Sequence, residues 1–188
     1  MHPQKIISII AMEEVLETRI KQAIRDVKDF PKKDILFKDI TPIFLNANLT
    51  RDIVDEMAKR IHPNIDIICG IESRGFLFGI LLAQKLEKPF VMIRKAGKLP
   101  AEKIAVQYKL EYGEAIIEMH KGFIQPNQRV LIHDDLLATG GTALAASELI
   151  RQQQGIVEQY SFLVELSFLK GQELLKTVSN QIDSLVIY

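Results

Sequence analysis

The stretch of residues 129–154 constrains the fold of this chain more than any other segment. It opens with an apolar, β-branched run that ends at His133, passes through Asp134-Asp135 and a glycine-bearing turn, and then shows helical periodicity from about Gly141. A short buried strand that leads directly into a helix is typical of parallel sheets, because parallel strands need crossover connections that are usually helical. This stretch therefore predicts one strand–helix unit of such a sheet.

The same pattern occurs at several other places in the chain. Residues 65–71 form a buried run that precedes a helical stretch over 76–86, and 89–93 forms another buried run. Further strands are expected over 156–166 and 185–188. The alternation predicts an α/β fold with a central, mostly parallel twisted sheet flanked by helices.

Other segments are expected to lie around this sheet. Apolar residues at intervals of three and four predict a helix over 13–27, and a second helix is expected to open at Thr50, as its cap, and to stop at Pro63. Weak alternation over 108–119, on both sides of Gly113, predicts a small hairpin outside the main sheet.

Bulk composition bounds the domain count and the class of partner. With 188 residues, of which 47% are hydrophobic, we expect one domain over 1–188, with residues 1–11 as a possible N-terminal extension because Met12 could serve as the start. Lysine plus arginine and aspartate plus glutamate are both 24, so no electrostatic footprint for nucleic acid or for a membrane surface is expected. No apolar stretch approaches the roughly 20 residues that cross a bilayer.

Cysteine and histidine usage adds two expectations. The single cysteine, Cys69, cannot form an internal disulfide, which favours a reducing, cytoplasmic setting. The four histidines show no metal-ligand spacing, so no metal site made by the protein alone is expected.

The strongest chemical signal follows the predicted strand at 129–133. Two neighbouring aspartates can serve one ligand where a strand has ended and the backbone bends, and Asp134-Asp135 stand at the expected exit. Carboxylates accept hydrogen bonds without donating them, which suits the vicinal hydroxyls of a ribose. The alternative for such a pair is a strand-to-helix loop with surface acids.

The residues after the acid pair suit a phosphate. Small side chains let backbone amides approach an anion, two hydroxyls add donors, and a helix start adds a favourable dipole. These residues are Ala138, Thr139, Gly140, Gly141 and Thr142. Neither a P-loop nor a Gly-x-Gly-x-x-Gly dinucleotide fingerprint occurs, so the pattern predicts a ribose 5-phosphate site of another kind.

The string from Val130 to Thr142 resembles the phosphoribosyl-pyrophosphate motif of the type I phosphoribosyltransferases, in the form found in members that use adenine. The resemblance extends over nearly the whole chain from Met12 onward. Further segments that resemble the family in the same order are 37–42, 72–79, 93–100, 110–113 and 164–166. The resemblance implies the type I phosphoribosyltransferase fold with a small hood and a flexible loop. It also implies formation of AMP and pyrophosphate from adenine and 5-phosphoribosyl 1-pyrophosphate, with Mg2+ held mainly by the substrate pyrophosphate and water, in a homodimer.

The resemblance also assigns residues to the pyrophosphate. The turn Glu72-Ser73-Arg74 is expected to hold it, and an arginine fork beside free amides at a helix start is a suitable clamp. A basic loop from residue 94 to 109 is expected to close over it as a lid, with Arg94 reaching across a dimer interface. Its pyrophosphate-binding residues are Arg94, Lys95 and Lys98. An aspartate often stands in the family where this chain has Glu72, and without the resemblance the loop could be an ordinary surface loop.

Base binding and catalysis are assigned on the same ground. The adenine is expected between Phe37 and Leu136, with Leu36 and Lys38 beside it, and an aromatic face opposite a leucine makes a slot for a flat ring. Glu111 and Tyr112 correspond to the family's catalytic glutamate and its neighbour, and a carboxylate near the imidazole part of a purine can exchange a proton.

Two other functions stay open at this point. The same fold could act on another purine, such as xanthine, guanine or hypoxanthine. A non-catalytic regulator that senses phosphoribosyl pyrophosphate and binds nucleic acid is disfavoured, because only about 30 residues precede the core and the net charge is zero.

Overall fold

The computed structural model describes residues 16–109 and 113–188. The chain divides into two compact units, with the division between Glu56 and Met57 inside one helix, and each unit is described by itself. The expectation of a single domain over 1–188 stays a prediction.

The N-terminal unit contains a helical segment over 16–23 and a two-stranded antiparallel sheet of β1 (Arg25–Lys28) and β2 (Leu36–Asp39). The predicted helix over 13–27 is therefore wrong at its C-terminal end. Cross-strand pairs of opposite charge explain the change, because Arg25 stands opposite Asp39 and Asp26 opposite Lys38. The Arg25 guanidinium lies 2.6 Å from Asp39, and Lys38 Nζ lies 2.7 Å from Asp26.

A 3-10 helix, η1 (Thr41–Leu45), and helix α2 (Ala47–Arg60) follow the hairpin. Helix α2 begins three residues before the predicted Thr50 start. Asn46 is its cap, because the Leu49 amide donates to Asn46 Oδ1 at 3.0 Å. The Thr50 hydroxyl instead donates to carbonyls of the preceding turn, at 3.1 Å from the oxygens of Ile43 and of Asn46.

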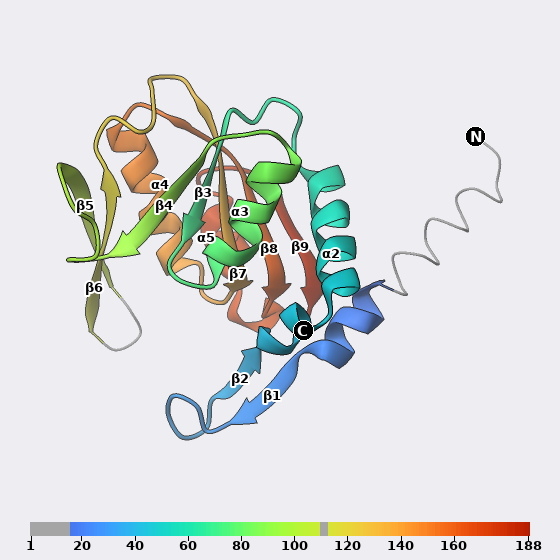
Figure 1. Ribbon diagram of the computed structural model, residues 1–188. Coiled ribbons are helices and arrows are strands. Elements are labelled where there is room, and N and C mark those ends of the chain that lie inside the picture. Colours follow the sequence, from blue (N-terminus) through green and yellow to red (C-terminus); the bar gives the residue numbers. More distant parts are fainter. Residues whose placement is uncertain (1–15, 110–112) are drawn as a thin grey trace. The chain divides into compact units, whose positions relative to one another are not determined.

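The C-terminal unit is built on one seven-stranded sheet in the order β5-β6-β4-β3-β7-β8-β9 (Figure 1). The five strands from β4 to β9 in this order pair in parallel, and hairpin β5–β6 adds to β4 in the antiparallel sense. The strands are β3 (Ile67–Ile71), β4 (Phe90–Lys95), β5 (Lys103–Lys109), β6 (Glu114–His120), β7 (Arg129–Leu137), β8 (Ile156–Glu165) and β9 (Ile182–Ile187). The predicted α/β fold with a mostly parallel sheet is confirmed.

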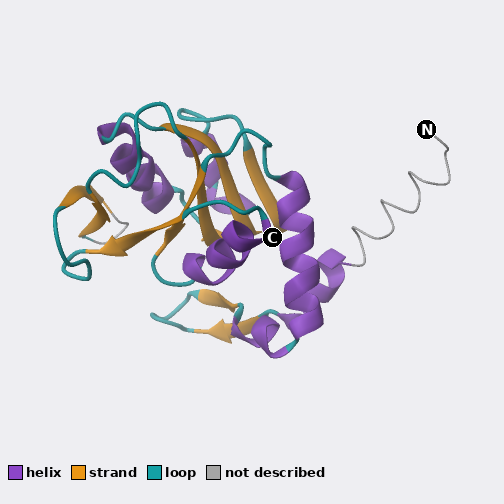
Figure 2. Cartoon of the chain, turned by 45° about the horizontal axis from the view of Figure 1, so that its top comes forward, coloured by secondary structure: helices purple, strands orange, loops and turns teal. Residues whose placement is uncertain are grey.

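Helices cover both faces of this sheet, as Figure 2 shows. Helix α3 (Gly75–Lys85) packs on β3 and β7, while α4 (Gly141–Gln152) packs on the other face, in one apolar cluster with α5 (Gly171–Leu175). A second 3-10 helix, η2 (Ser167–Leu169), precedes α5. Buried side chains of the strands, among them Cys69 and Ile132, fill the α4 side. None of the helices described over 16–109 and 113–188 has the length and apolar content to cross a bilayer.

Two expectations about the strands need correction. The hairpin predicted outside the main sheet is part of it, because β4 extends to Lys95 and offers β6 an edge for pairing at Arg94 and Lys95. Strand β7 does not end at His133 but continues through both aspartates to Leu137, because β8 is long enough to pair with it as far as Glu165. The bend expected at the acid pair is therefore absent.

Candidate functional site

A small cavity lies where β7 ends and α4 begins, at the carboxyl edge of the parallel sheet. Its volume is about 80 Å³. Ligands of parallel α/β sheets bind at this edge. Its lining contains all five residues of the predicted phosphate turn together with Asp134 and Leu136; the full set is Asp134, Leu136, Leu137, Ala138, Thr139, Gly140, Gly141, Thr142, Ala143 and Phe162.

The turn itself needs glycine at position 140. Gly140 has φ of +82°, a left-handed conformation that side chains rarely adopt, and it stands directly before the first residue of α4. A Cβ there would also come within 2.9 Å of the carbonyl oxygen of Gly171. Gly171 in turn has no room for a side chain, since its Cβ would lie 2.2 Å from the carbonyl oxygen of Ala138. The phosphate turn therefore rests, backbone on backbone, on the first residue of α5.

Asp134 and Asp135 leave adjacent positions of a regular strand and make different contacts. Asp134 lines the cavity, and its Oδ1 accepts the amide of Asp135 at 2.9 Å. Asp135 is 3% exposed, and its Oδ2 lies 3.1 Å from Arg74 Nε. Burial and the neighbouring Asp135 charge raise the pKa of Asp134 well above its ordinary range. Burial also raises the pKa of Asp135, against the lowering effect of Arg74.

The turn 72–74 joins β3 to α3 at the same edge, and the Glu72–Ser73 peptide bond is cis. Glu72 accepts hydrogen bonds from Arg94 Nε at 3.1 Å and from the Lys95 amide at 2.9 Å. Burial alone would raise the pKa of Glu72, but these hydrogen bonds lower it below its ordinary value. Glu72 thus ties the end of β4 to the turn.

The predicted basic lid is divided by regular structure, because residues 103–109 of the predicted loop form β5. Arg94 also donates to the Lys98 carbonyl at 3.0 Å, so within this chain it is held by Glu72 and Lys98. Its reach across a dimer interface stays a prediction. The side chains of Lys95 and Lys98 are exposed beside it.

An acid that the sequence reasoning missed anchors this segment. Glu118 on β6 accepts the Gly97 amide at 3.0 Å and lies 3.3 Å from Lys103 Nζ. Glu118 is buried, and a glutamate is rarely buried unless it has partners such as these. Alternation along β6 places Glu118 on the same face as the exposed Glu114 and Ile116, so the local sequence pattern does not predict its burial.

The residues predicted to bind the base fall in both units. Phe37, half-buried on β2, packs edge to face against Phe30, with ring centroids 5.0 Å apart, and Leu36 beside it is exposed. Lys38 is buried against Asp26. Leu136 lines the cavity of the C-terminal unit. The predicted catalytic residues Glu111 and Tyr112 lie outside the described residues.

Over residues 16–109 and 113–188, no group of three or more histidine, cysteine, aspartate or glutamate side chains is placed to hold a metal ion. Asp134 lines the same cavity as the phosphate turn, and the two carboxylates of the acid pair can assist but not enclose Mg2+.

Comparison with known proteins identifies the family. A phosphoribosyl transferase domain model matches residues 44–158. An adenine phosphoribosyltransferase of Ureaplasma parvum serovar 3 is 53% identical over 170 residues, covering 90% of this chain and 96% of the relative. The corresponding enzyme of Cytophaga hutchinsonii is 48% identical over 177 residues, covering 94% and 98%.

Solved structures agree with these relatives. A crystal structure of adenine phosphoribosyltransferase from Thermoanaerobacter pseudethanolicus has a TM-score of 0.87 and 45% identity, covering 91% of this chain and 99% of that one. The Giardia lamblia enzyme complexed with 9-deazaadenine has a TM-score of 0.85 and 35% identity, covering 91% and 97%. With its phosphate turn and acid pair at the carboxyl edge, this chain belongs to the adenine phosphoribosyltransferase family.

Proposed function

We propose that this chain forms AMP and pyrophosphate from adenine and 5-phosphoribosyl 1-pyrophosphate, as a step of purine salvage. The observation that carries the proposal is the cavity at the end of β7, where a glycine-bearing turn, a helix start and the carboxylate of Asp134 meet. A ribose 5-phosphate offers a dianion for the turn and hydroxyls for the carboxylate, so its two ends match the two halves of the site.

The acid pair would hold the ribose through its hydroxyls. The pKa of Asp134 is raised in the free chain, so a ligand that donates hydrogen bonds would stabilise its ionised form. A nearby carboxylate also stabilises positive charge on the ring carbon as the pyrophosphate departs, because glycosyl transfer passes through a transition state with oxocarbenium character.

The pyrophosphate would lie between the turn 72–74 and the basic segment that follows β4. Arg74 offers a guanidinium next to the acid pair, and the exposed Lys95 and Lys98 supply cationic groups without fixed geometry. Closure of this segment would exclude water from the reacting carbon. Mg2+ bound through pyrophosphate oxygens and water, with Asp134 or Asp135 as the nearest protein oxygens, would neutralise charge on the leaving group.

The base would stack on Phe37 of the hairpin β1–β2. Phe37 packs edge to face against Phe30, and an aromatic ring of this kind can stack on a flat purine. Leu36, Lys38 and Leu136 are also proposed to bind the base. Glu111 would exchange a proton with the imidazole part of the purine, next to Tyr112.

A homodimer is part of the proposal. Large apolar side chains are exposed on three elements of the C-terminal unit: Leu77 and Ile80 on α3, Met92 on β4 and Ile116 on β6. An exposed group of this kind marks an interaction surface, and the end of β4 with Arg94 continues it. Sedimentation of the chain, with Ile80→Asp as the variant, would show a dimer that the substitution dissociates. A cytoplasmic location is proposed because the single cysteine is buried and unpaired.

The activity is tested by following turnover of single bases at saturating phosphoribosyl pyrophosphate and Mg2+. We expect AMP from adenine, and little or no product from xanthine, guanine or hypoxanthine. Product from a 6-oxopurine alone would overturn the choice of base, while salt-sensitive DNA binding without any product would favour a regulator.

A further inference from the structure

A polar contact joins hairpin β5–β6 to the start of α4, the helix that follows the phosphate turn. Tyr108 lies on β5, near its C-terminal end, and its hydroxyl lies 3.3 Å from Thr142 Oγ1, the second residue of α4. Within the described part of the chain, β5 is an edge strand that pairs with β6 alone, and α4 also contacts it. In Figure 1 this hairpin lies beside α4.

Thr142 occupies a position where its hydroxyl has two possible partners. It lines the cavity with the rest of the phosphate turn, and in the free chain it donates its hydrogen to Tyr108 Oη. A phosphate in the turn has only acceptor oxygens, so the Thr142 hydrogen would turn to the phosphate. Tyr108 would then donate to Thr142, which forms a chain from Tyr108 through Thr142 to the phosphate. Such a chain strengthens each of its hydrogen bonds.

Tyr108 lies close in the sequence to the predicted catalytic residue Glu111. Tyr108 precedes Glu111 by three residues, on the strand that leads to it. A contact that tightens when the phosphate binds would therefore fix the end of β5 from which the catalytic segment continues. We propose that Tyr108 is a positioning residue that couples occupancy of the 5-phosphate turn to hairpin β5–β6. This inference rests on the proposed function of the turn.

The chain contains a matched control for a tyrosine hydroxyl against helix α4. Tyr160 on β8 lies 2.5 Å from the Ser147 hydroxyl, five residues further along the same helix, and both side chains are fully buried. Tyr160 does not line the cavity. A Tyr→Phe change removes one oxygen in each case. If tyrosine hydroxyls matter only for holding α4 in place, the two variants should behave alike.

The experiment compares Tyr108→Phe with Tyr160→Phe in steady-state kinetics and thermal unfolding. We expect Tyr108→Phe to raise KM for phosphoribosyl pyrophosphate about fivefold, the effect of one hydrogen bond, with KM for adenine and the unfolding midpoint unchanged. Tyr160→Phe should lower the unfolding midpoint and leave both KM values within twofold. Equal losses in the two variants, or a change of less than twofold in Tyr108→Phe, would overturn the proposal.

A double-mutant cycle identifies the route of the effect. In a Thr142→Val background, Tyr108→Phe should have no further effect on KM, while in a Thr142→Ser background, which keeps the hydroxyl, the fivefold effect should persist. Equal effects in the valine and serine backgrounds would contradict coupling through Thr142. If the unaltered chain forms no AMP, the proposed function fails. The cycle is then read from calorimetric binding of phosphoribosyl pyrophosphate, so that Tyr108 is still tested.

Discussion

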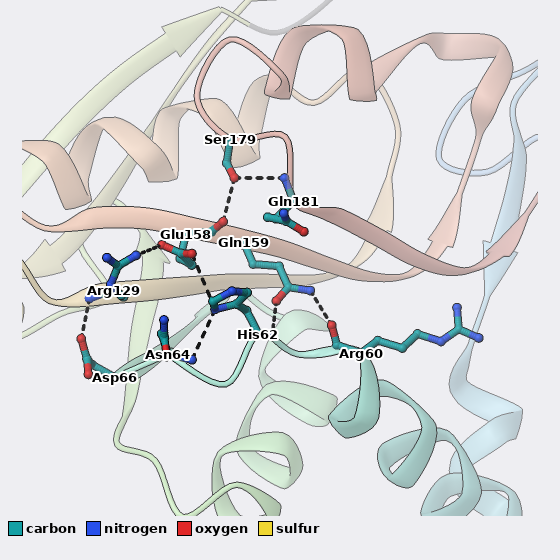
Figure 3. A network of polar contacts seen from close by, with 9 residues as sticks. All are labelled: Arg60, His62, Asn64, Asp66, Arg129, Glu158, Gln159, Ser179 and Gln181. Carbon is teal, nitrogen blue, oxygen red and sulfur yellow. Dashed lines mark hydrogen bonds and ion pairs between the residues drawn. The ribbon is translucent and has the colours of Figure 1, made fainter. Parts of the chain in front are cut away.

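Both edges of the parallel sheet contain paired charges, but only the carboxyl edge also contains two adjacent carboxylates, Asp134 and Asp135. At the amino edge, charged and amide side chains pair with one another and with nearby backbone groups (Figure 3). Asp66 accepts the Arg129 amide at 2.7 Å, the Arg129 guanidinium pairs with Glu158, and His62 lies 3.6 Å from the same carboxylate. At the carboxyl edge, burial and a neighbouring acid raise the pKa of Asp134.

This contrast between the two edges indicates where a binding site can lie. Groups that satisfy one another within the chain stabilise the fold and leave little free energy for a ligand. Two adjacent carboxylates, of which Asp135 is buried and Asp134 partly buried, cost stability when both are ionised, and a ligand can recover that cost. The variants below test whether the carboxyl edge carries function and the amino edge carries stability.

The largest effect is expected at Asp134. Asp134→Asn keeps the shape and the hydrogen bond from the Asp135 amide but removes the charge. We expect kcat/KM to fall about 100- to 1000-fold, as for loss of one group that stabilises transition-state charge.

The same variant should not lose stability. Since the folded-state pKa of Asp134 is raised, the unfolded chain ionises at lower pH, and the folded chain is penalised above the ordinary pKa of 3.8. The free energy of unfolding of Asp134→Asn should therefore exceed that of the unaltered chain at pH 7, and the two should converge below pH 3.8. Urea titrations at both pH values measure this. The control is Glu158→Gln at the amino edge, which should weaken the fold and leave kcat/KM unchanged.

A second prediction concerns His133, which lies on β7 between the two edges. Burial lowers its pKa from 6.5 to about 4, so the folded chain holds a neutral imidazole. Between these values the unfolded chain takes up a proton that the folded chain excludes, so the contribution of His133 to stability is lost as the pH falls from 6.5 to 4. The shift corresponds to about 3 kcal/mol.

Replacement of His133 by valine removes this titration. Unfolding free energies at pH 7 and at pH 4.5 should therefore differ less for His133→Val than for the unaltered chain. An equal pH dependence in both proteins would show that the imidazole becomes protonated in the folded state.

Most of the correct predictions about the fold and the site came from short stretches of neighbouring residues. The β-branched runs indicated the parallel strands, and the small residues after Asp135 indicated the phosphate turn, because both signals lie within a few neighbouring residues. The change from helix to strand β1 at Arg25 depends on pairing with Asp39. Position 171 requires glycine because the backbone of Ala138 leaves no room for a side chain there. These contacts join residues that are not neighbours in the sequence, and a single sequence does not show which distant residues come together.

The same reason explains the misreading at the acid pair. The sequence around Asp134 suggested a bend, but the length of β7 is set by its pairing with β8 as far as Glu165. A strand end depends on its neighbour, which is a property of the sheet and not of the segment.

The smallest expected effect is a loss of stability at the amino edge, which should leave substrate binding at the carboxyl edge unchanged. Gln159, buried on β8, accepts the His62 amide at 2.7 Å and donates to the Arg60 carbonyl at 3.0 Å, so one side chain satisfies two backbone groups at the end of α2. Gln159→Ala should lower the free energy of unfolding by about 1–3 kcal/mol, because both groups lose a buried partner.

The matched control is Gln181→Ala in the same network. The Gln181 side chain is exposed, and the residue joins the network through its backbone amide, which donates to the Ser179 hydroxyl at 3.1 Å. Its removal should change stability by less than about 0.5 kcal/mol. KM for phosphoribosyl pyrophosphate should stay the same in both variants, because the amino edge lies at the opposite ends of the strands from the turn. A raised KM for phosphoribosyl pyrophosphate in Gln159→Ala at unchanged stability would mean that the two edges are coupled through β8. The assignment of stability to the amino edge and function to the carboxyl edge would then be wrong.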